Sequence, residues 1–166
     1  MSKTLVMKFG GTSVGSVDAL KSAIQIIRDA KKDWDRVVVV TSAMSGVTNL
    51  LLDSAASASH GKVDSLPQAA ATLREKHFNV AEALIQNSVK LNQVIAEIDD
   101  LIFSLVDLCK AIAVLGEASP RAMDTVASLG ERMSVRLLAA VIDSAGISAQ
   151  AIESTEFVVT NAHFQN

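Results

Sequence analysis

Apolar residues follow two patterns of spacing along this chain, one typical of buried β-strands and one typical of amphipathic helices. Residues 3–9 and the uninterrupted β-branched run 37–40 have the strand pattern, and residues 17–32 between them have the helical one. A continuous run of valines is typical of a strand buried on both faces of a parallel sheet. Strand, helix and strand in this order predict a right-handed βαβ unit.

The middle of the chain has a different character, because helical spacing dominates it from Val47 to Ile112. Residues 64–115 predict two long helices that form an antiparallel hairpin beside the sheet. Turn-forming residues between Asn87 and Asn92 separate the two helices, and Gly116 ends the second.

The last part of the chain predicts one more long helix followed by short strands. Ser119 suits the N-cap of this helix and Pro120 its first turn, and the helix stops at Gly146. Strands are expected at residues 147–152 and 157–160. No repeat or linker interrupts the pattern, so we predict one helix-rich α/β domain: a three-layer sandwich around a mostly parallel sheet, with an inserted helical hairpin.

Composition narrows the function classes. The chain has 166 residues, of which 49% are hydrophobic and 20% charged, enough for one sizeable core. A net charge of −3 without a basic stripe argues against nucleic acid as a partner. No apolar run approaches the roughly 20 residues of a membrane span, and no signal peptide precedes the first strand. One cysteine, Cys109, excludes an internal disulfide, and the three histidines lack metal-ligand spacing. These observations favour a cytoplasmic protein without a metal site of its own.

The end of the first predicted strand carries the clearest chemistry. Lys8 is followed by Gly10 and Gly11, whose backbone can approach an anion closely and adopt a positive φ, and then by a helix N-terminus. Carboxyl ends of parallel strands are where open α/β sheets bind ligands. The lysine precedes the glycines, so the pattern is neither a Walker loop nor a dinucleotide fingerprint. It indicates phosphate binding, and the alternative is a plain glycine turn beside an unrelated lysine.

Two further features are candidates for ligand contacts. A hydroxyl-rich loop, residues 41–48, leaves the second strand at the same edge of the sheet, where Gly46 permits close approach; alternatively, Ser45 merely caps the next helix. Gly130 lies in a helix interior, where glycine is costly, which suggests a close approach of backbone or ligand. From the helical pattern alone, its neighbour Glu131 would be an ordinary solvated glutamate. Arg132 and Arg136 are expected to be surface or salt-bridge residues.

Three segments together resemble the aspartate kinases of the amino acid kinase superfamily. KFGGTSV, residues 8–14, resembles the opening signature of that family. VVVVTSAMSGVTNLL, residues 37–51, is similar to its second strand and the loop that follows. SLGERMS, residues 128–134, is similar to its substrate-binding helix. The resemblance covers essentially the whole chain but only the front of the family's catalytic domain, so we expect an N-terminal part that lacks the nucleotide-binding half and the regulatory domains.

The resemblance implies transfer of the γ-phosphoryl group of ATP, with Mg²⁺ bound to the nucleotide, to the side-chain carboxylate of L-aspartate. This reaction is the first step of lysine, threonine and methionine biosynthesis. The implied phosphate-binding residues are Lys8, Gly10, Gly11, Thr12 and Ser13, with Lys8 as the catalytic cation. The implied substrate-binding residues are Ser42, Thr48 and Glu131, the last on the α-ammonium group.

Several alternatives stay open at this point. A second enzyme hypothesis is another amino acid kinase, for glutamate, acetylglutamate or a nucleotide, although by the resemblance the helical insertion and SLGERMS favour aspartate. A third hypothesis, from a different functional class, is a non-catalytic module that binds an anion, an amino acid or only a partner protein. The unpaired sheet edge or the helical hairpin suggests a homodimer. The isolated chain is expected to be inactive, because the resemblance implies that the adenine pocket and the arginine that completes the aspartate site come from sequence beyond it.

Overall fold

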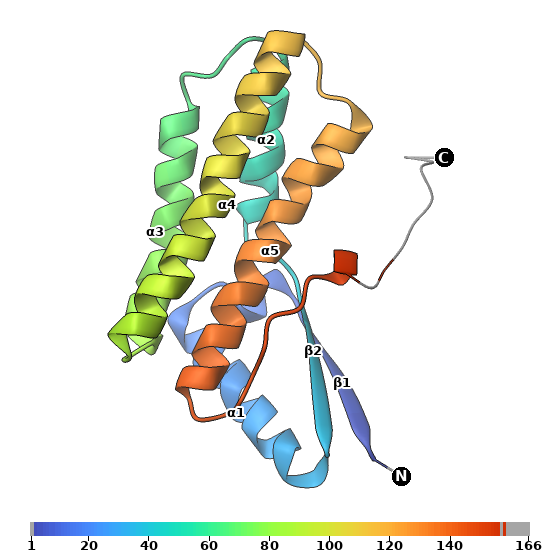
Figure 1. The fold of residues 1–166 in the computed structure, drawn as a ribbon, viewed down its shortest axis with the longest axis vertical. Coiled ribbons are helices and arrows are strands. Elements are labelled where there is room, and N and C mark those ends of the chain that lie inside the picture. Colours follow the sequence, from blue (N-terminus) through green and yellow to red (C-terminus); the bar gives the residue numbers. More distant parts are fainter. Residues whose placement is uncertain (1, 157, 159–166) are drawn as a thin grey trace.

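A computed structural model describes residues 2–156 and residue 158 (Figure 1). Two strands, two short 3₁₀ turns and five α-helices make up the described residues. A bundle of four helices occupies one end of the molecule, and the strands with the first helix occupy the other. In chain order the elements are β1 (Thr4–Phe9), η1 (Gly11–Ser13), α1 (Val17–Asp33), β2 (Arg36–Thr41), α2 (Val47–Ser59), α3 (Leu66–Leu84), α4 (Ser88–Leu115), α5 (Pro120–Ser144) and η2 (Ser154–Glu156).

The predicted βαβ unit is present. Strands β1 and β2 are parallel and in register from Thr4 opposite Arg36 to Phe9 opposite Thr41, and α1 connects them. The Ser16 hydroxyl caps α1 by accepting a hydrogen bond from the Ala19 N–H at 3.2 Å, and Leu20, Ile24 and Ile27 are buried. The α/β, helix-rich class with parallel strands is therefore confirmed.

The expectation that β2 is buried on both faces is wrong for the described residues. Val38 and Val40 are 47% and 46% exposed, and Val6 of β1 shares their face at 63%. Helices α1 and α5 contact β2, and the alternate residues of both strands are half-buried. Successive side chains of a strand point to opposite faces, so the described helices cover one face of this sheet.

The hairpin between residues 64 and 115 is also present, as α3 and α4. The Asn87 side chain caps α4 by accepting from the Lys90 N–H at 3.0 Å. The break falls at residues 85–87, so only Asn87 belongs to the expected turn and residues 88–92 are already helical. Gly116 ends α4 with a φ of 73°, a left-handed conformation that favours glycine. Helix α4 packs against α2, α3 and α5, which makes the hairpin part of the main core.

Helix α5 begins as predicted and carries one side of the candidate site. The Ser119 hydroxyl accepts from the Ala122 N–H at 3.3 Å, and Pro120 occupies the first turn. Its inward face contains Val126, Met133, Leu137 and Val141. Among the helices within residues 2–156, none combines the length and the hydrophobicity needed to cross a bilayer.

The strand predicted at residues 147–152 is not formed. This segment has no regular structure and runs beside α5 toward β2 (Figure 1). Side-chain contacts hold it instead of a ladder: Arg132 and Arg136 donate to the Glu153 carboxylate at 2.9 and 2.5 Å. Partial burial opposes ionisation of Glu153, but these hydrogen bonds outweigh it and hold its pKa below the usual value. The strand expected at residues 157–160 lies outside the described residues, apart from Val158.

His77 is fully buried in α3, and its Nε2 has no partner among the described residues, while Nδ1 lies 2.7 Å from the Leu73 carbonyl. Burial lowers the pKa of His77 below 6.5, so the folded state holds the neutral ring. The unfolded chain takes up a proton near pH 6.5, so stability is complete above that pH and falls as the pH drops below it. In urea unfolding between pH 7.5 and 5.5, we expect the free energy of unfolding to fall less steeply with decreasing pH in His77→Leu than in wild type. Exposed His60→Gln is the matched control, and an equal slope in wild type and His77→Leu would contradict this origin.

Cys109 lies in the core of α4 and is fully buried, as its helical spacing with apolar residues predicts. Burial raises the pKa of its thiol to about 11. At pH 8 the thiolate fraction is therefore about 10²-fold smaller than for a free cysteine, and the reagent must also reach a closed core. We expect an aromatic disulfide reagent to label the native chain at least about 100-fold more slowly than the urea-unfolded chain. Equal labelling rates would contradict this burial.

Candidate functional site

Lys8 and the glycine turn form the first part of the site. Lys8 lies near the carboxyl end of β1 on the exposed face of the sheet. Its ammonium Nζ is 3.8 Å from the point where a Cβ at Gly10 would stand, so the cation lies over the turn. The N–H groups of Gly10 and Gly11 donate to no described residue. A full positive charge and two free donors in one turn are what an anion requires.

The structural reason for glycine in this turn differs from the expected one. Gly10 has a φ of −80°, and the positive-φ glycines are Gly46, Gly61, Gly116 and Gly146. A Cβ at Gly11 would stand 2.6 Å from the Ala43 carbonyl oxygen. Space, not backbone conformation, therefore requires glycine at position 11. Thr12 and Ser13 are exposed within η1, and α1 begins only at Val17, so its N-terminus does not directly follow the glycines.

The loop after β2, residues 42–46, lies directly against the turn. The Ser42 N–H donates to the Phe9 carbonyl and the Ser45 N–H to the Gly11 carbonyl, both at 3.2 Å. Ser45 does not cap α2: the N-cap is Gly46, whose φ of 79° and open surroundings show that conformation fixes this glycine. The predicted substrate residues Ser42 and Thr48 are half-buried, in this loop and in the first turn of α2.

Glu131 joins the same loop from α5. Its Oε1 accepts a hydrogen bond from the Ala43 N–H at 3.1 Å, although the side chain is otherwise exposed. Beside it, a Cβ at Gly130 would stand 2.8 Å from the Ala43 Cβ, so the close approach at this glycine is made by a side-chain atom and not by backbone or ligand as expected. The Thr41 and Ser134 hydroxyls, 3.3 Å apart, add a second link between β2 and α5. The structure thus brings Lys8, Gly10, Gly11, Ser42 and Glu131 to one edge of the sheet.

A groove of about 470 Å³ runs along the free edge of β2 beside Glu131. Residues of β2 form one wall, α5 contributes Ser128, Glu131 and Arg132, and residues 150–155 form the other wall. Arg132 and Arg136 are ion-paired with Glu153, as their sequence pattern predicts, and so fix that second wall.

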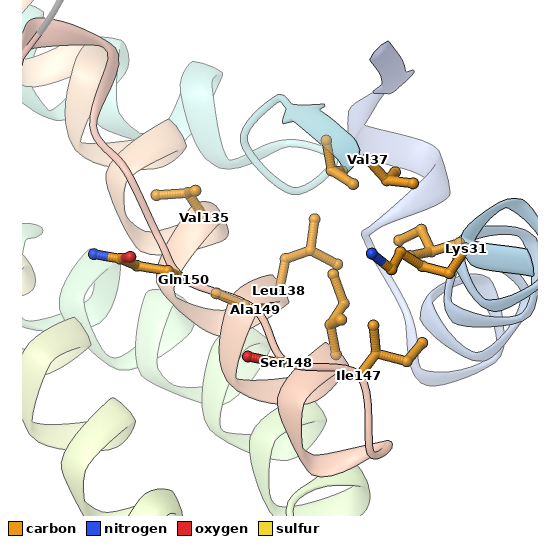
Figure 2. Close-up of a pocket in the computed structure, with 12 residues that line it drawn as sticks. Lys31, Val37, Val135, Leu138, Ile147, Ser148, Ala149 and Gln150 are labelled. Atoms are coloured by element: carbon orange, nitrogen blue, oxygen red, sulfur yellow. The ribbon is translucent and has the colours of Figure 1, made fainter. Parts of the chain in front are cut away.

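A smaller cavity of about 200 Å³ adjoins this groove, with which it shares Val37, Val39, Val135 and Gln150, and is lined by none of the predicted site residues. Figure 2 shows its lining: Lys31 from α1, Val37 from β2, Val135 and Leu138 from α5, and residues 147–150. Most of these side chains are aliphatic, and the cavity lies where the unstructured segment crosses α5. We interpret it as imperfect packing beneath that segment.

The described residues include no group of three histidine, cysteine, aspartate or glutamate side chains that could hold a metal ion. The turn itself offers the Lys8 ammonium and the N–H groups of Gly10 and Gly11, which suit the oxygens of a phosphate.

Sequence reasoning missed two contributors. Ala43 touches both the turn and α5, and an alanine carries no chemical signal that could have singled it out. Lys76 of α3 donates to the Ser45 carbonyl at 3.4 Å and so ties the helical hairpin to the loop. An exposed lysine on a long helix is too common to have been selected from sequence.

Comparisons with known proteins show which family the chain resembles. Residues 3–165 match the amino acid kinase family. The chain is 32% identical to an aspartokinase of Schizosaccharomyces pombe over 98% of its own length and 32% of that protein. It is also 32% identical to the chloroplastic bifunctional aspartokinase/homoserine dehydrogenase 1 of Arabidopsis thaliana, over 93% of the chain and 16% of that protein.

A solved structure gives the same result. The crystal structure of Escherichia coli aspartokinase III in complex with aspartate and ADP superposes with a TM-score of 0.74 at 30% identity, over 89% of this chain and 30% of that one. The chain therefore spans about a third or less of the length of these relatives. The match of residues 3–165 and the superposition lead to one conclusion: this chain belongs to the amino acid kinase family.

Proposed function

We propose that the protein takes part in ATP-dependent phosphorylation of the side-chain carboxylate of L-aspartate, giving aspartyl phosphate and ADP. The observation that carries the proposal is the junction at Ala43, where an anion-binding turn with Lys8 and an acidic residue, Glu131, meet across one loop. Relatives named aspartokinases and a neighbour solved with aspartate and ADP support this choice of substrates. The product would enter lysine, threonine and methionine biosynthesis.

The proposed reaction requires positive groups that stabilise the phosphoryl charge, and alignment of the acceptor carboxylate with the phosphate. The acceptor carboxylate of aspartate has an ordinary pKa near 4, so it is ionised at neutral pH and needs no general base. Lys8 and the N–H groups of Gly10 and Gly11 would stabilise the negative charge of the transferring phosphoryl group, with Thr12 and Ser13 beside them. Glu131 would bind the α-ammonium group of aspartate, and Ser42 and Thr48 would contact the rest of the amino acid. Mg²⁺ would neutralise part of the phosphate charge of ATP.

The direct test is release of ADP by the complete encoded polypeptide, with ATP, Mg²⁺ and one candidate acceptor at a time. We expect turnover with L-aspartate and at least about 100-fold less with glutamate, N-acetylglutamate or a nucleoside monophosphate. Turnover with one of those instead would make the protein another member of the family. Absence of turnover with every acceptor would favour a non-catalytic binding module.

For the 166-residue chain by itself we expect no aspartate-dependent release of ADP. The chain spans about a third or less of its relatives, and phosphoryl transfer depends on positioning both substrates at once. Robust turnover by these residues alone would contradict this division of the site. A homodimer, a cytoplasmic location and the absence of nucleic-acid and membrane partners likewise remain predictions.

A further inference from the structure

Ala43 contacts three parts of the candidate site: the Gly11 turn, Gly130 and the Glu131 side chain. Its carbonyl oxygen is 2.6 Å from where a Cβ at Gly11 would stand, and its own Cβ is 2.8 Å from where a Cβ at Gly130 would stand. Its N–H donates to Glu131 Oε1 at 3.1 Å. Ala43 is itself only 4% exposed, so the surrounding atoms enclose it.

The contacts on the two sides of Ala43 differ in kind. On the side of the turn, the Ser45 N–H donates to the Gly11 carbonyl, and a Cβ at Gly15 would stand 2.8 Å from that same oxygen. On the side of α5, Gly130 is buried among Ala43, Val47 and Leu51. The first side is backbone against backbone, which cannot yield by a side-chain rotation.

We propose that Gly130 is a positioning residue: by leaving room for Ala43, it sets the loop of residues 42–46 at the distance from α5 at which both the Gly11 turn and Glu131 are correctly placed. Gly130 touches neither the turn nor a ligand position directly; it acts through Ala43. The expected effect of Gly130 on substrate binding rests on the proposed function. Its expected effect on the position of the loop does not depend on any activity.

Gly130→Ala is expected to loosen the loop, opposite to the stabilisation that this substitution usually gives in a helix. Replacing an interior helical glycine by alanine normally stabilises a helix, because alanine is the better helix former. Here the new Cβ would meet the Ala43 Cβ below contact distance, and that atom is fixed to the backbone. The loop must therefore move, which weakens the bonds from Ala43 to Glu131 and from Ser45 to Gly11.

A compensating pair of substitutions separates positioning from a general loss of stability. Ala43→Gly removes the obstructing Cβ and leaves the side-chain ends of Leu51 and Val47, each 3.3 Å from the new atom and able to shift slightly. The double variant Gly130→Ala/Ala43→Gly therefore exchanges the two methyl groups across the contact. Ala43→Gly alone is the control for the added flexibility of the loop.

The test is amide hydrogen exchange of the 166-residue chain, read at Ala43 and Ser45. We expect Gly130→Ala to speed exchange at both amides by at least about tenfold, with unchanged protection in the α3–α4 hairpin. The double variant is expected to recover most of the protection at Ser45. Unchanged exchange in Gly130→Ala, or a double variant no better than the single one, would overturn the proposal.

A kinetic measurement on the complete encoded polypeptide adds a readout that a purely structural role would not move. Gly130→Ala is expected to raise the KM for aspartate and for ATP together by about tenfold, since both halves of the site depend on the same loop, and the double variant to restore both. A change in the KM for aspartate alone would contradict the joint role. If wild type has no turnover, the proposed function fails, and the exchange measurement still decides the role of Gly130.

Discussion

Lys8→Ala is expected to reduce the aspartate-dependent phosphoryl transfer rate of the complete encoded polypeptide by about 10²–10³-fold. The Lys8 ammonium lies over Gly10, beside two N–H groups that donate to no described residue. Loss of one preorganised contact to charge that develops in the transition state typically costs about 3–4 kcal/mol, which corresponds to that factor. The KM for aspartate should change much less, because Lys8 is assigned to the phosphate side.

Two variants sharpen this test. Lys21→Ala removes an exposed lysine of α1 that forms no ion pair with a described residue, so its kcat should match wild type. Lys8→Arg keeps the charge in a bulkier, planar group and should recover only part of the rate. Near-wild-type turnover in Lys8→Ala would remove Lys8 from the site.

Glu131→Gln is expected to raise the KM for aspartate by about 10- to 100-fold and leave the KM for ATP nearly unchanged. A hydrogen bond to a charged group contributes about 1.5–3 kcal/mol, which gives that range. The amide oxygen of glutamine can still accept the bond from the Ala43 N–H, so the substitution removes the charge while it keeps the loop contact. The charge is what an α-ammonium group would require.

Two further variants separate the charge of Glu131 from its hydrogen bond to the Ala43 N–H. Glu131→Ala removes both the charge and the acceptor for Ala43, so it should also disturb the Gly11 turn and raise the KM for ATP. Glu75→Gln changes an exposed glutamate on α3 and should have no effect. If the KM for aspartate stays within about twofold in Glu131→Gln, Glu131 is only the partner of Ala43.

Local signals in the sequence were sufficient for most of the fold. Ser119 followed by Pro120 predicted the start of α5 correctly, because capping hydroxyls and a fixed proline φ act within one turn of the chain. The hairpin α3–α4 was predictable because a sustained helical period has no competing interpretation over such lengths. The βαβ unit could be predicted from the order of strand, helix and strand, which almost always gives a right-handed crossover between parallel strands.

The errors arose where structure depends on distant partners. Residues 147–152 have a strand-like composition, but the arginines of α5 hold Glu153, and no ladder to β2 forms in the described residues. The valines of β2 suggested burial on both sides, which depends on what covers each face and not on the valines themselves. In the candidate site, Lys8, Glu131 and the glycines could be singled out from the sequence, whereas Ala43 and Lys76 became visible only through the atoms around them.

The central claim is the identity of the phosphorylated group, and trapping of the product tests it most directly. An acyl phosphate reacts with hydroxylamine to give a hydroxamate, whereas a phosphate ester or phosphoramidate does not. With the complete encoded polypeptide, ATP, Mg²⁺, L-aspartate and hydroxylamine, the account predicts β-aspartyl hydroxamate in amounts equal to the ADP released, and at least about 100-fold less from Lys8→Ala. Release of ADP without hydroxamate, or hydroxamate from glutamate in place of aspartate, would contradict it.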